Sequence, residues 1–214
     1  MDPMTFTTPN GLRLELRIPA GSIEVETADT GETLLEINGE REPAEFRVEC
    51  SERPEGGHRL RVEQHRRRAF AFGWSRDLRV RVRAPRGTHV QADTGSADLQ
   101  ARGEIGSLSF RSGSGDVAFD RVNGDVTIKI ASGDAKGARV DGDLSANSAS
   151  GEIRIDAVGG DLVARSASGD VEVESTGGSA HVSTASGDIG VGGLARGEAT
   201  LRSVSGDIDV TVTR

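Results

Sequence analysis

A glycine that recurs at a nearly fixed interval is the feature that most constrains this chain. From residue 112 onward, Ser-Gly-Asp or Ser-Gly-Glu occurs six times, and its glycines are separated by 18, 18, 18, 18 and 19 residues. A second glycine series lies midway between them. The two series comprise Gly115, Gly133, Gly151, Gly169, Gly187 and Gly206, and Gly124, Gly142, Gly160, Gly178 and Gly197. This self-similarity predicts stacked equivalent units of about nine residues, paired into a coil of about 18.

Each nine-residue unit alternates apolar and polar residues after its glycine. The second and fourth positions are apolar or small almost throughout, as in Val117 and Phe119. A period of two is typical of a half-buried β-strand, and a glycine every nine residues excludes helices. The seventh position is also apolar or alanine, and we expect it to point inward before each turn. The alanines of this set are Ala131, Ala149, Ala167 and Ala185.

These patterns predict an all-β protein, a parallel β-solenoid (β-helix) with coils of about 18 residues built of two strand-turn units of about nine. Because the apolar positions are equivalent every nine residues, a flattened two-sided coil is favoured, and a three-sided section remains the alternative. The general crossover preference favours a right-handed coil. Ala135 and Gly137 replace larger residues, so their coil is expected to be thin or dented.

The chain divides into two parts, which can still form one continuous domain. Residues 1–92 are predicted to form a β-strand region with irregular coils, in which Gly21 and Gly31 echo the repeat, and residues 93–214 the regular solenoid. Residues 46–82 have longer strands and a turn signal at 53–57. This segment is predicted to be a hairpin excursion that caps the end or flank of the solenoid, where an open sheet edge would invite aggregation.

Composition agrees with a repeated, narrow core. Aromatic residues make up 3% of the chain, against 35% for all hydrophobic residues and 29 glycines. Residues 93–214 hold 11 basic and 19 acidic side chains, which accounts for the whole net charge of −8 and argues against a nucleic-acid groove there. Cys50 is the only cysteine, so it forms no intramolecular disulfide, and we expect it to be half-buried. We expect no transmembrane segment, and the lack of a signal-like leader predicts a cytoplasmic chain.

The repeats SGSGDV, SASGEI, SASGDV and TASGDI, following VRVRAPRGTHVQADTGSADL, carry a family resemblance. Over nearly its whole length the chain resembles the bacterial "putative adhesin" family of β-strand-repeat proteins, a domain of unknown function. The resemblance implies a parallel β-solenoid and an adhesin-like role, and it supplies no catalytic residues. Relatives in that family are often membrane-associated or exported.

Carboxylates follow the coil glycines and should stack into a ladder beside a ladder of serine hydroxyls. These candidate metal ligands are Asp116, Asp134, Glu152, Asp170, Asp188 and Asp207. One interpretation is cation binding, and the favoured one is that the side chains satisfy backbone amides at the corners. The motif differs from the nonapeptide of calcium β-rolls because Asp directly follows a single Gly, so specific calcium sites are not expected.

Arginines and aromatic residues gather in the predicted cap. The partner-binding candidates are Arg66, Arg67, Arg68, Trp74, Arg79, Arg81 and Arg83, with Arg59 and Arg61 nearby. An anion or an acidic partner would fit this cluster, whereas pairing with Glu49, Glu52 and Glu63 would make it a solvated face. Phe70, Phe72 and Trp74 are expected to plug the cap.

No catalytic motif and no cofactor motif emerges. Residues 113–118 match a dinucleotide fingerprint, but a strand follows them instead of a helix, so no helix N-terminus is available for a pyrophosphate. We therefore expect a non-enzymatic structural or interaction protein that presents a repetitive surface to a protein or surface partner. The alternatives are a self-assembling scaffold with end-to-end or edge contacts, by analogy with bactofilins, and cation or glycan binding along the Ser/Asp edges.

Overall fold

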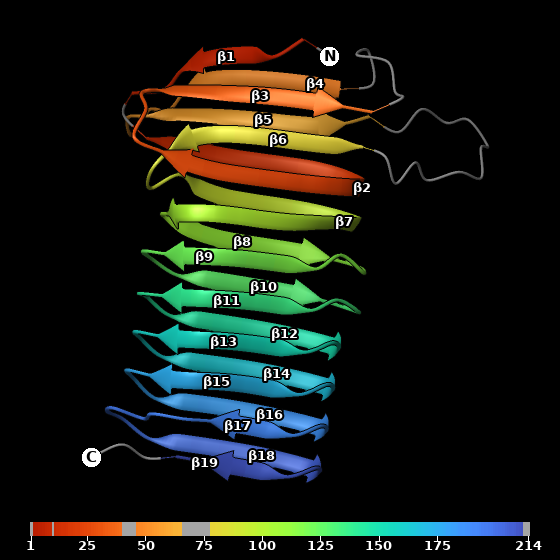
Figure 1. Ribbon diagram of the computed structural model, residues 1–214, viewed down its shortest axis with the longest axis vertical. Helices are drawn as coiled ribbons and strands as arrows, with labels where there is room; N and C mark the ends of the chain where they lie inside the picture. The colour runs from red at the N-terminus through yellow and green to blue at the C-terminus, as the bar shows by residue number, and fades with distance from the viewer. Residues whose placement is uncertain (1, 10, 40–45, 66–77, 212–214) are drawn as a thin grey trace, which may run out of the picture.

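The computed structural model describes residues 2–9, 11–39, 46–65 and 78–211. In these ranges the chain forms nineteen β-strands and no helix, stacked along one long axis (Figure 1). No helix that could cross a membrane occurs among the described residues. The fold is therefore all-β, as the alternating pattern predicts.

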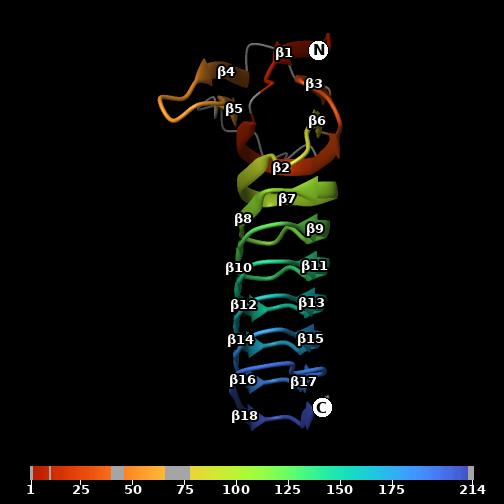
Figure 2. The ribbon, with the colours of Figure 1, turned by 90° about the vertical axis from the view of Figure 1, so that its left-hand side faces the viewer.

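Strands β8 to β19 form a solenoid with two opposite faces (Figure 2). We call them face A and face B. Face A contains β8 (Ser107–Ser112), β10 (Val126–Ile130), β12 (Leu144–Ser150), β14 (Leu162–Ser168), β16 (Ala180–Ser186) and β18 (Ala199–Ser205). Face B contains β9 (Val117–Val122), β11 (Ala135–Val140), β13 (Ile153–Val158), β15 (Val171–Thr176), β17 (Ile189–Val191) and β19 (Ile208–Val210). The predicted two-sided section is confirmed, whereas the handedness stays a prediction.

The glycine period sets the register of the stack. On face A, Val126 pairs in parallel with Leu108 on one side and with Leu144 on the other, so equivalent residues lie directly above each other. On face B, Ile153 pairs in the same way with Ala135 and Val171. Each residue therefore forms a column with its counterparts about 18 positions away, and the parallel β-solenoid is confirmed.

The corner glycines are required by close stacking between coils. A Cβ atom built on Gly151 would lie 2.0 Å from the carbonyl oxygen of Gly133, one coil earlier. Gly169 meets Gly151 in the same way, at 2.3 Å. Side chains at these corners would push the coils apart, so the glycine column allows the strand spacing of the sheet to continue around the turn.

The predicted inward position of the alanines is wrong. Ala131, Ala149, Ala167 and Ala185 are exposed. The buried residues precede them by one position and are Ile130, Ser148, Ser166 and Thr184. On face A the alternation stops one position before each alanine, and the register skips the alanine itself, as at Ala149 and Ala167. On face B the register skips an earlier residue, Ala138, so the seventh position turns inward there, as at Val122 and Val140.

The coil that contains Ala135 and Gly137 is filled from the neighbouring coil. A Cβ atom on Gly137 would lie 2.1 Å from Cζ of Phe119, whose ring is 4% exposed. The ring of Phe119 therefore occupies the interior space that a larger residue at 137 would need. On the outer surface a shallow hollow of about 230 Å³ lies over Ala118 and Ala138, in agreement with the predicted dent.

Two long strands connect the solenoid to the N-terminal region. Strand β2 (Leu12–Ala28) pairs in parallel with β7 (His89–Ile105), and both cross from face A to face B. On the other side of β2, β5 (His58–Gln64) pairs with its first half and β6 (Arg79–Pro85) with its second half. The first coil of the sequence is thus enclosed between two later ones. Strand β7 crosses residue 92, and the division of the chain there stays a prediction.

Antiparallel strands cover the N-terminal end. Strand β4 (Phe46–Glu52) pairs with β5, while β3 (Glu32–Asn38) pairs with β6 and β1 (Met4–Thr7) with β3. At the tip of the β4–β5 hairpin the amide of Gly56 donates to the carbonyl of Arg53 at 3.0 Å. The predicted capping hairpin is confirmed, and its proposed aromatic plug of Phe70, Phe72 and Trp74 lies outside the described residues.

Candidate partner-binding surfaces

The carboxylate ladder predicted at the coil corners is present, and its members hydrogen-bond to the backbone. The amide of Asp134 donates to Oδ1 of Asp116 at 2.9 Å, and the amide of Glu152 donates to Oδ1 of Asp134 at 3.0 Å. Asp170 and Asp188 each accept the amide one coil later in the same way, at 2.8 Å. One oxygen of each of these four aspartates therefore connects adjacent coils, as the favoured interpretation predicts.

A second ladder occupies the opposite corner. Asp125, Asp143 and Asp161 accept the amides of Asp143, Asp161 and Ser179 at 2.7 to 3.0 Å. Within the described ranges no three His, Cys, Asp or Glu side chains form a group that could hold a metal ion. The aspartates of both corners accept backbone amides of the next coil.

Glu152 interrupts the first ladder. Its carboxylate makes an ion pair with Arg154, Oε1 to Nη2 at 2.6 Å, and that arginine also donates to Glu172 at 2.8 Å. Glu152 has one methylene more than Asp, and it accepts no amide from the next coil.

The predicted arginine cluster is divided between the two faces. Strand β5 presents Arg59 and Arg61 beside the face A half of β2, whereas β6 presents Arg79, Arg81 and Arg83 beside the face B half. In Figure 2, β5 and β6 lie on opposite sides of the N-terminal region. The remaining candidates, Arg66, Arg67, Arg68 and Trp74, lie outside the described residues.

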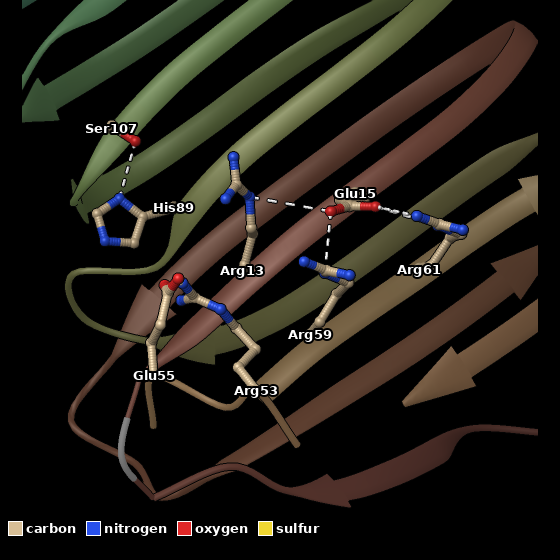
Figure 3. Close-up of polar contacts among 8 residues, drawn as sticks. All are labelled: Arg13, Glu15, Arg53, Glu55, Arg59, Arg61, His89 and Ser107. Atoms are coloured by element: carbon tan, nitrogen blue, oxygen red, sulfur yellow. Dashed lines mark hydrogen bonds and ion pairs between the residues drawn. The ribbon is translucent and has the colours of Figure 1, made fainter. Parts of the chain in front are cut away.

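On face A, Glu15 of β2 forms ion pairs with three arginines from two strands (Figure 3). Nη2 of Arg61 lies 2.8 Å from Oε2, Nε of Arg59 lies 3.1 Å from Oε1, and Nε of Arg13 lies 3.9 Å from Oε1. The Glu15 hydrogen bond and charge raise the pKa of Arg61. Register explains the network, because Arg61 lies directly opposite Glu15 in the parallel pair.

His89 lies at the margin of this network. Its Nδ1 is 2.8 Å from Oγ of Ser107, and Figure 3 places its ring near Arg13 and Arg53. Partial burial, followed by the positive charges of Arg13 and Arg53, lowers the pKa of His89. The local field is therefore positive, although Arg53 also pairs with Glu55 at 2.7 Å.

On face B, Glu24 of β2 pairs with two of the predicted arginines. Nε of Arg81 lies 2.8 Å from Oε2 and Nε of Arg79 lies 3.7 Å from Oε1. Arg83 makes no ion pair with any described residue, and it lines a surface cavity of about 320 Å³ with Glu26 and Arg102. The predicted arginines of β5 and β6, except Arg83, are thus paired by the β2 carboxylates Glu15 and Glu24. The glutamates expected as their partners make ion pairs elsewhere, Glu63 with Arg17 at 3.7 Å and Glu49 with Arg47.

The most uneven charge distribution lies elsewhere, on face A of the repeats. The six strands β8 to β18 of face A contain no Asp or Glu, whereas their basic residues are Arg111, Lys129, Arg165 and Arg202. These four side chains share one column, with Asn147 and Ser183 at the intervening coils. The last three make no ion pair with any described residue. Aligning the sequence at a period of 18 would have found this column.

Face B of the repeats has a mixed surface. Its strands β9 to β19 carry Asp120, Asp156, Glu172, Glu174 and Asp209 together with four basic residues. Asp141 accepts from Arg139 at 2.6 Å and from Arg121 at 2.7 Å. These hydrogen bonds, that of Arg139 first, lower the pKa of Asp141. Charges on face B are therefore largely compensated within the face.

Cys50 lies on β4 and is exposed, not half-buried as expected from the sequence. Among the described strands, β4 pairs with β5 alone, and its residues are exposed or half-buried. Alternation of apolar and polar residues in this edge strand therefore does not imply burial. Partial burial of its thiol raises its pKa. This shift disfavours the thiolate, the reactive form of cysteine.

Three solved structures are similar to this chain, and the first of them supports its fold. A "putative adhesin" from Bacteroides fragilis superimposes with a TM-score of 0.63 at 16% identity, over 99% of this chain and 96% of that one. A "putative cell adhesion protein" from Clostridium sporogenes matches at 8% identity and a TM-score of 0.34, over 99% of both chains. A "putative lipid binding protein" from Parabacteroides distasonis matches at 12% identity and 0.39, over 99% and 97%.

Among curated proteins, none matches this sequence. The family model described as Toastrack DUF4097 matches residues 13–214. That span includes the enclosed strand β2, the arginine networks and every coil of the repeat. The resemblance to a domain of unknown function with adhesin-like members is confirmed, and the chain belongs to the Toastrack DUF4097 family.

Proposed function

We propose that this protein is a non-enzymatic interaction module of adhesin type, whose face A docks on an acidic surface of a partner. The observation that carries the proposal is the column of Lys129, Arg165 and Arg202 on six strands without a carboxylate. Unpaired cations on a flat sheet attract an acidic partner without first breaking internal ion pairs. The Bacteroides fragilis structure, described as a "putative adhesin", supports the class of function.

The spacing of the column suits an extended partner. Lys129, Arg165 and Arg202 occupy every second coil, and strands in a sheet are about 4.8 Å apart, so successive cations are about 10 Å apart. In the next column, Thr127 lies beside Lys129 and Thr200 beside Arg202, so two of the three charges have a neighbouring hydroxyl. Such a surface combines long-range attraction with short-range hydrogen bonding.

Binding to a model acidic polymer tests the proposal. Immobilised polyglutamate should retain the protein at low salt and release it as salt is raised, because exposed charges are screened over about 8 Å at physiological ionic strength. A Lys129→Glu/Arg165→Glu variant should lose most of this retention. The matched variant Lys136→Glu/Arg154→Glu, with the same charge change on face B, should keep it. Equal loss in both variants would contradict a role for face A.

Two other properties are proposed alongside this function. The cytoplasmic location expected from the sequence stays a prediction, which fractionation of native cells with an antibody would test.

The arginines of the N-terminal region, Arg79, Arg81 and Arg83 among them, are proposed as a secondary contact with the partner. Arg83→Glu should weaken retention on polyglutamate less than the face A variant does.

A further inference from the structure

The end of the solenoid opposite the cap has two unpaired strand edges. Strand β18 pairs only with β16, and β19 pairs only with β17, among the described residues. Figures 1 and 2 show these two strands as the last layer of the stack. In the layers before it each strand has a parallel neighbour on both sides, so this layer presents free backbone donors and acceptors.

The same layer has the most exposed apolar side chains of the described structure. Val204, Ile208 and Val210 are 87%, 45% and 39% exposed. One coil earlier, Ile189 and Val191, which are in register with Ile208 and Val210, are 1% and 2% exposed. Among the described residues nothing covers the apolar core column in this last layer, and exposed apolar residues gathered in this way are typical of an interaction site.

The two ends of the molecule do not match each other. At the N-terminal end, β1 and β4 are the outermost strands, and Figure 2 shows them widely separated. Strand β4 also carries the ion pair of Arg47 and Glu49, and charged side chains of this kind protect an edge from pairing. A head-to-tail stack of copies would have to join these dissimilar edges, so a filament is disfavoured.

We propose that the open end docks on the same end of a second copy of this chain, in a two-fold symmetric dimer. A two-fold axis perpendicular to the two faces would place β18 antiparallel to β18 of the other copy, and β19 antiparallel to β19. Identical strands have identical lengths, so both edges pair fully. This contact is closed, because it uses both of the matching edges that the described strands present.

One register joins the edges without bringing like charges together. With Leu201 opposite Leu201 of the other copy, Arg202 lies opposite Thr200 and Val204 lies opposite Glu198. With Val210 opposite Val210, Asp209 lies opposite Thr211. The inward residues Ala199 and Leu201 stay inward in this register, so the two cores become continuous. Each copy contributes only one coil, which is smaller than the roughly 800 Å² per partner of a standard interface. The dimer should therefore form in the micromolar range.

Sedimentation velocity over a concentration series tests the inference, which does not depend on the proposed function. The protein should shift from a 22.4 kDa monomer to a species of twice that mass as concentration rises, up to about 500 µM given the small interface. Val204→Glu/Ile208→Glu should remain monomeric over this range, because it places like charges opposite each other at residues 198 and 204 and a charge in the apolar core column. Val163→Glu/Thr127→Glu, on the outer surface of face A, should dimerise like the wild type.

Circular dichroism establishes that each variant retains the wild-type β-sheet signal. A wild-type protein that stays monomeric throughout would overturn the inference, and so would equal dimerisation of the Val204→Glu/Ile208→Glu variant. Species that grow beyond the dimer with concentration would overturn it as well, because they require contacts that do not close.

Discussion

The N-terminal region and the regular repeats use the same strand pattern but are held together in different ways. In the repeats, each coil contacts only the coils before and after it, and glycine columns and aspartate ladders are renewed every 18 residues. In the N-terminal region, β2 lies between β7 and the pair β5 and β6, which are distant in sequence. The repeats depend on local register, whereas the cap depends on long-range pairing and on side-chain ion pairs.

The largest expected effect is a loss of stability, and it distinguishes a glycine required by close stacking of coils from a glycine in a hairpin turn. Gly151→Ala places a Cβ atom against the backbone of the previous coil, and we expect a loss of about 3 kcal/mol in the free energy of unfolding. Gly56, at the tip of the cap hairpin, has φ of +89° and nothing within 4 Å of its Cβ position. Gly56→Ala should cost only about 1 kcal/mol, from backbone strain alone. Urea unfolding measures both, and equal losses would erase the difference between the regions.

The first coils of the repeats predict a strong coupling between two side-chain positions, 119 and 137. Gly137→Ala should destabilise the protein by about 2 kcal/mol, because its Cβ overlaps the ring of Phe119. In a Phe119→Leu background the same substitution should cost little, so the double variant is about as stable as Phe119→Leu alone. A double-mutant cycle by urea unfolding should give a coupling of about 1 to 2 kcal/mol. Additive losses would show that the ring does not fill the coil.

The aspartate ladder should respond to hydrogen-bonding capacity more than to charge. Asp134→Ala removes the acceptor of the Glu152 amide and should cost about 1 kcal/mol, whereas Asp134→Asn keeps an acceptor and should cost about half of that. Glu152→Asp should restore the missing contact with the next coil and stabilise the protein by about 0.5 kcal/mol. Thermal unfolding measures all three. A stabilising Asp134→Ala variant would mean that charge repulsion dominates the ladder.

The smallest expected effect is a pH dependence of stability that arises from His89 in the N-terminal region. The pKa of His89 is lowered in the folded state, so the unfolded chain binds a proton more readily. Stability should therefore fall as the pH drops through about 6.5, the ordinary value for histidine, and the loss is complete below the folded pKa. His89→Gln should flatten the thermal stability between pH 7.5 and pH 6 in buffered scans, and His181→Gln, on the exposed surface of β16, serves as the control. If the stability of the His89→Gln variant changed with pH as that of the wild type does, His89 would not be the source of the pH dependence.

Much of the fold could be predicted because its determinants are local and repeated. Gly115 and its counterparts fix the period, and alternation at Val117 and Phe119 identifies the inward positions. Ala131 shows the limit of this reasoning, because the turn geometry of face A and face B differs while their glycine spacing does not. A register set by a skipped residue such as Ala138 leaves no mark in the pattern.

The sequence by itself determined the two-sided solenoid, its coil length, the capping hairpin and the corner ladders, since each follows from spacing along the chain. Only the tertiary structure decided that β2 is enclosed, that the arginines of β5 and β6 lie on opposite faces, and that Glu15 and Glu24 are their partners. These facts depend on pairing between strands up to about 80 residues apart. Long-range pairing is set by packing of the whole molecule, and no local pattern specifies it.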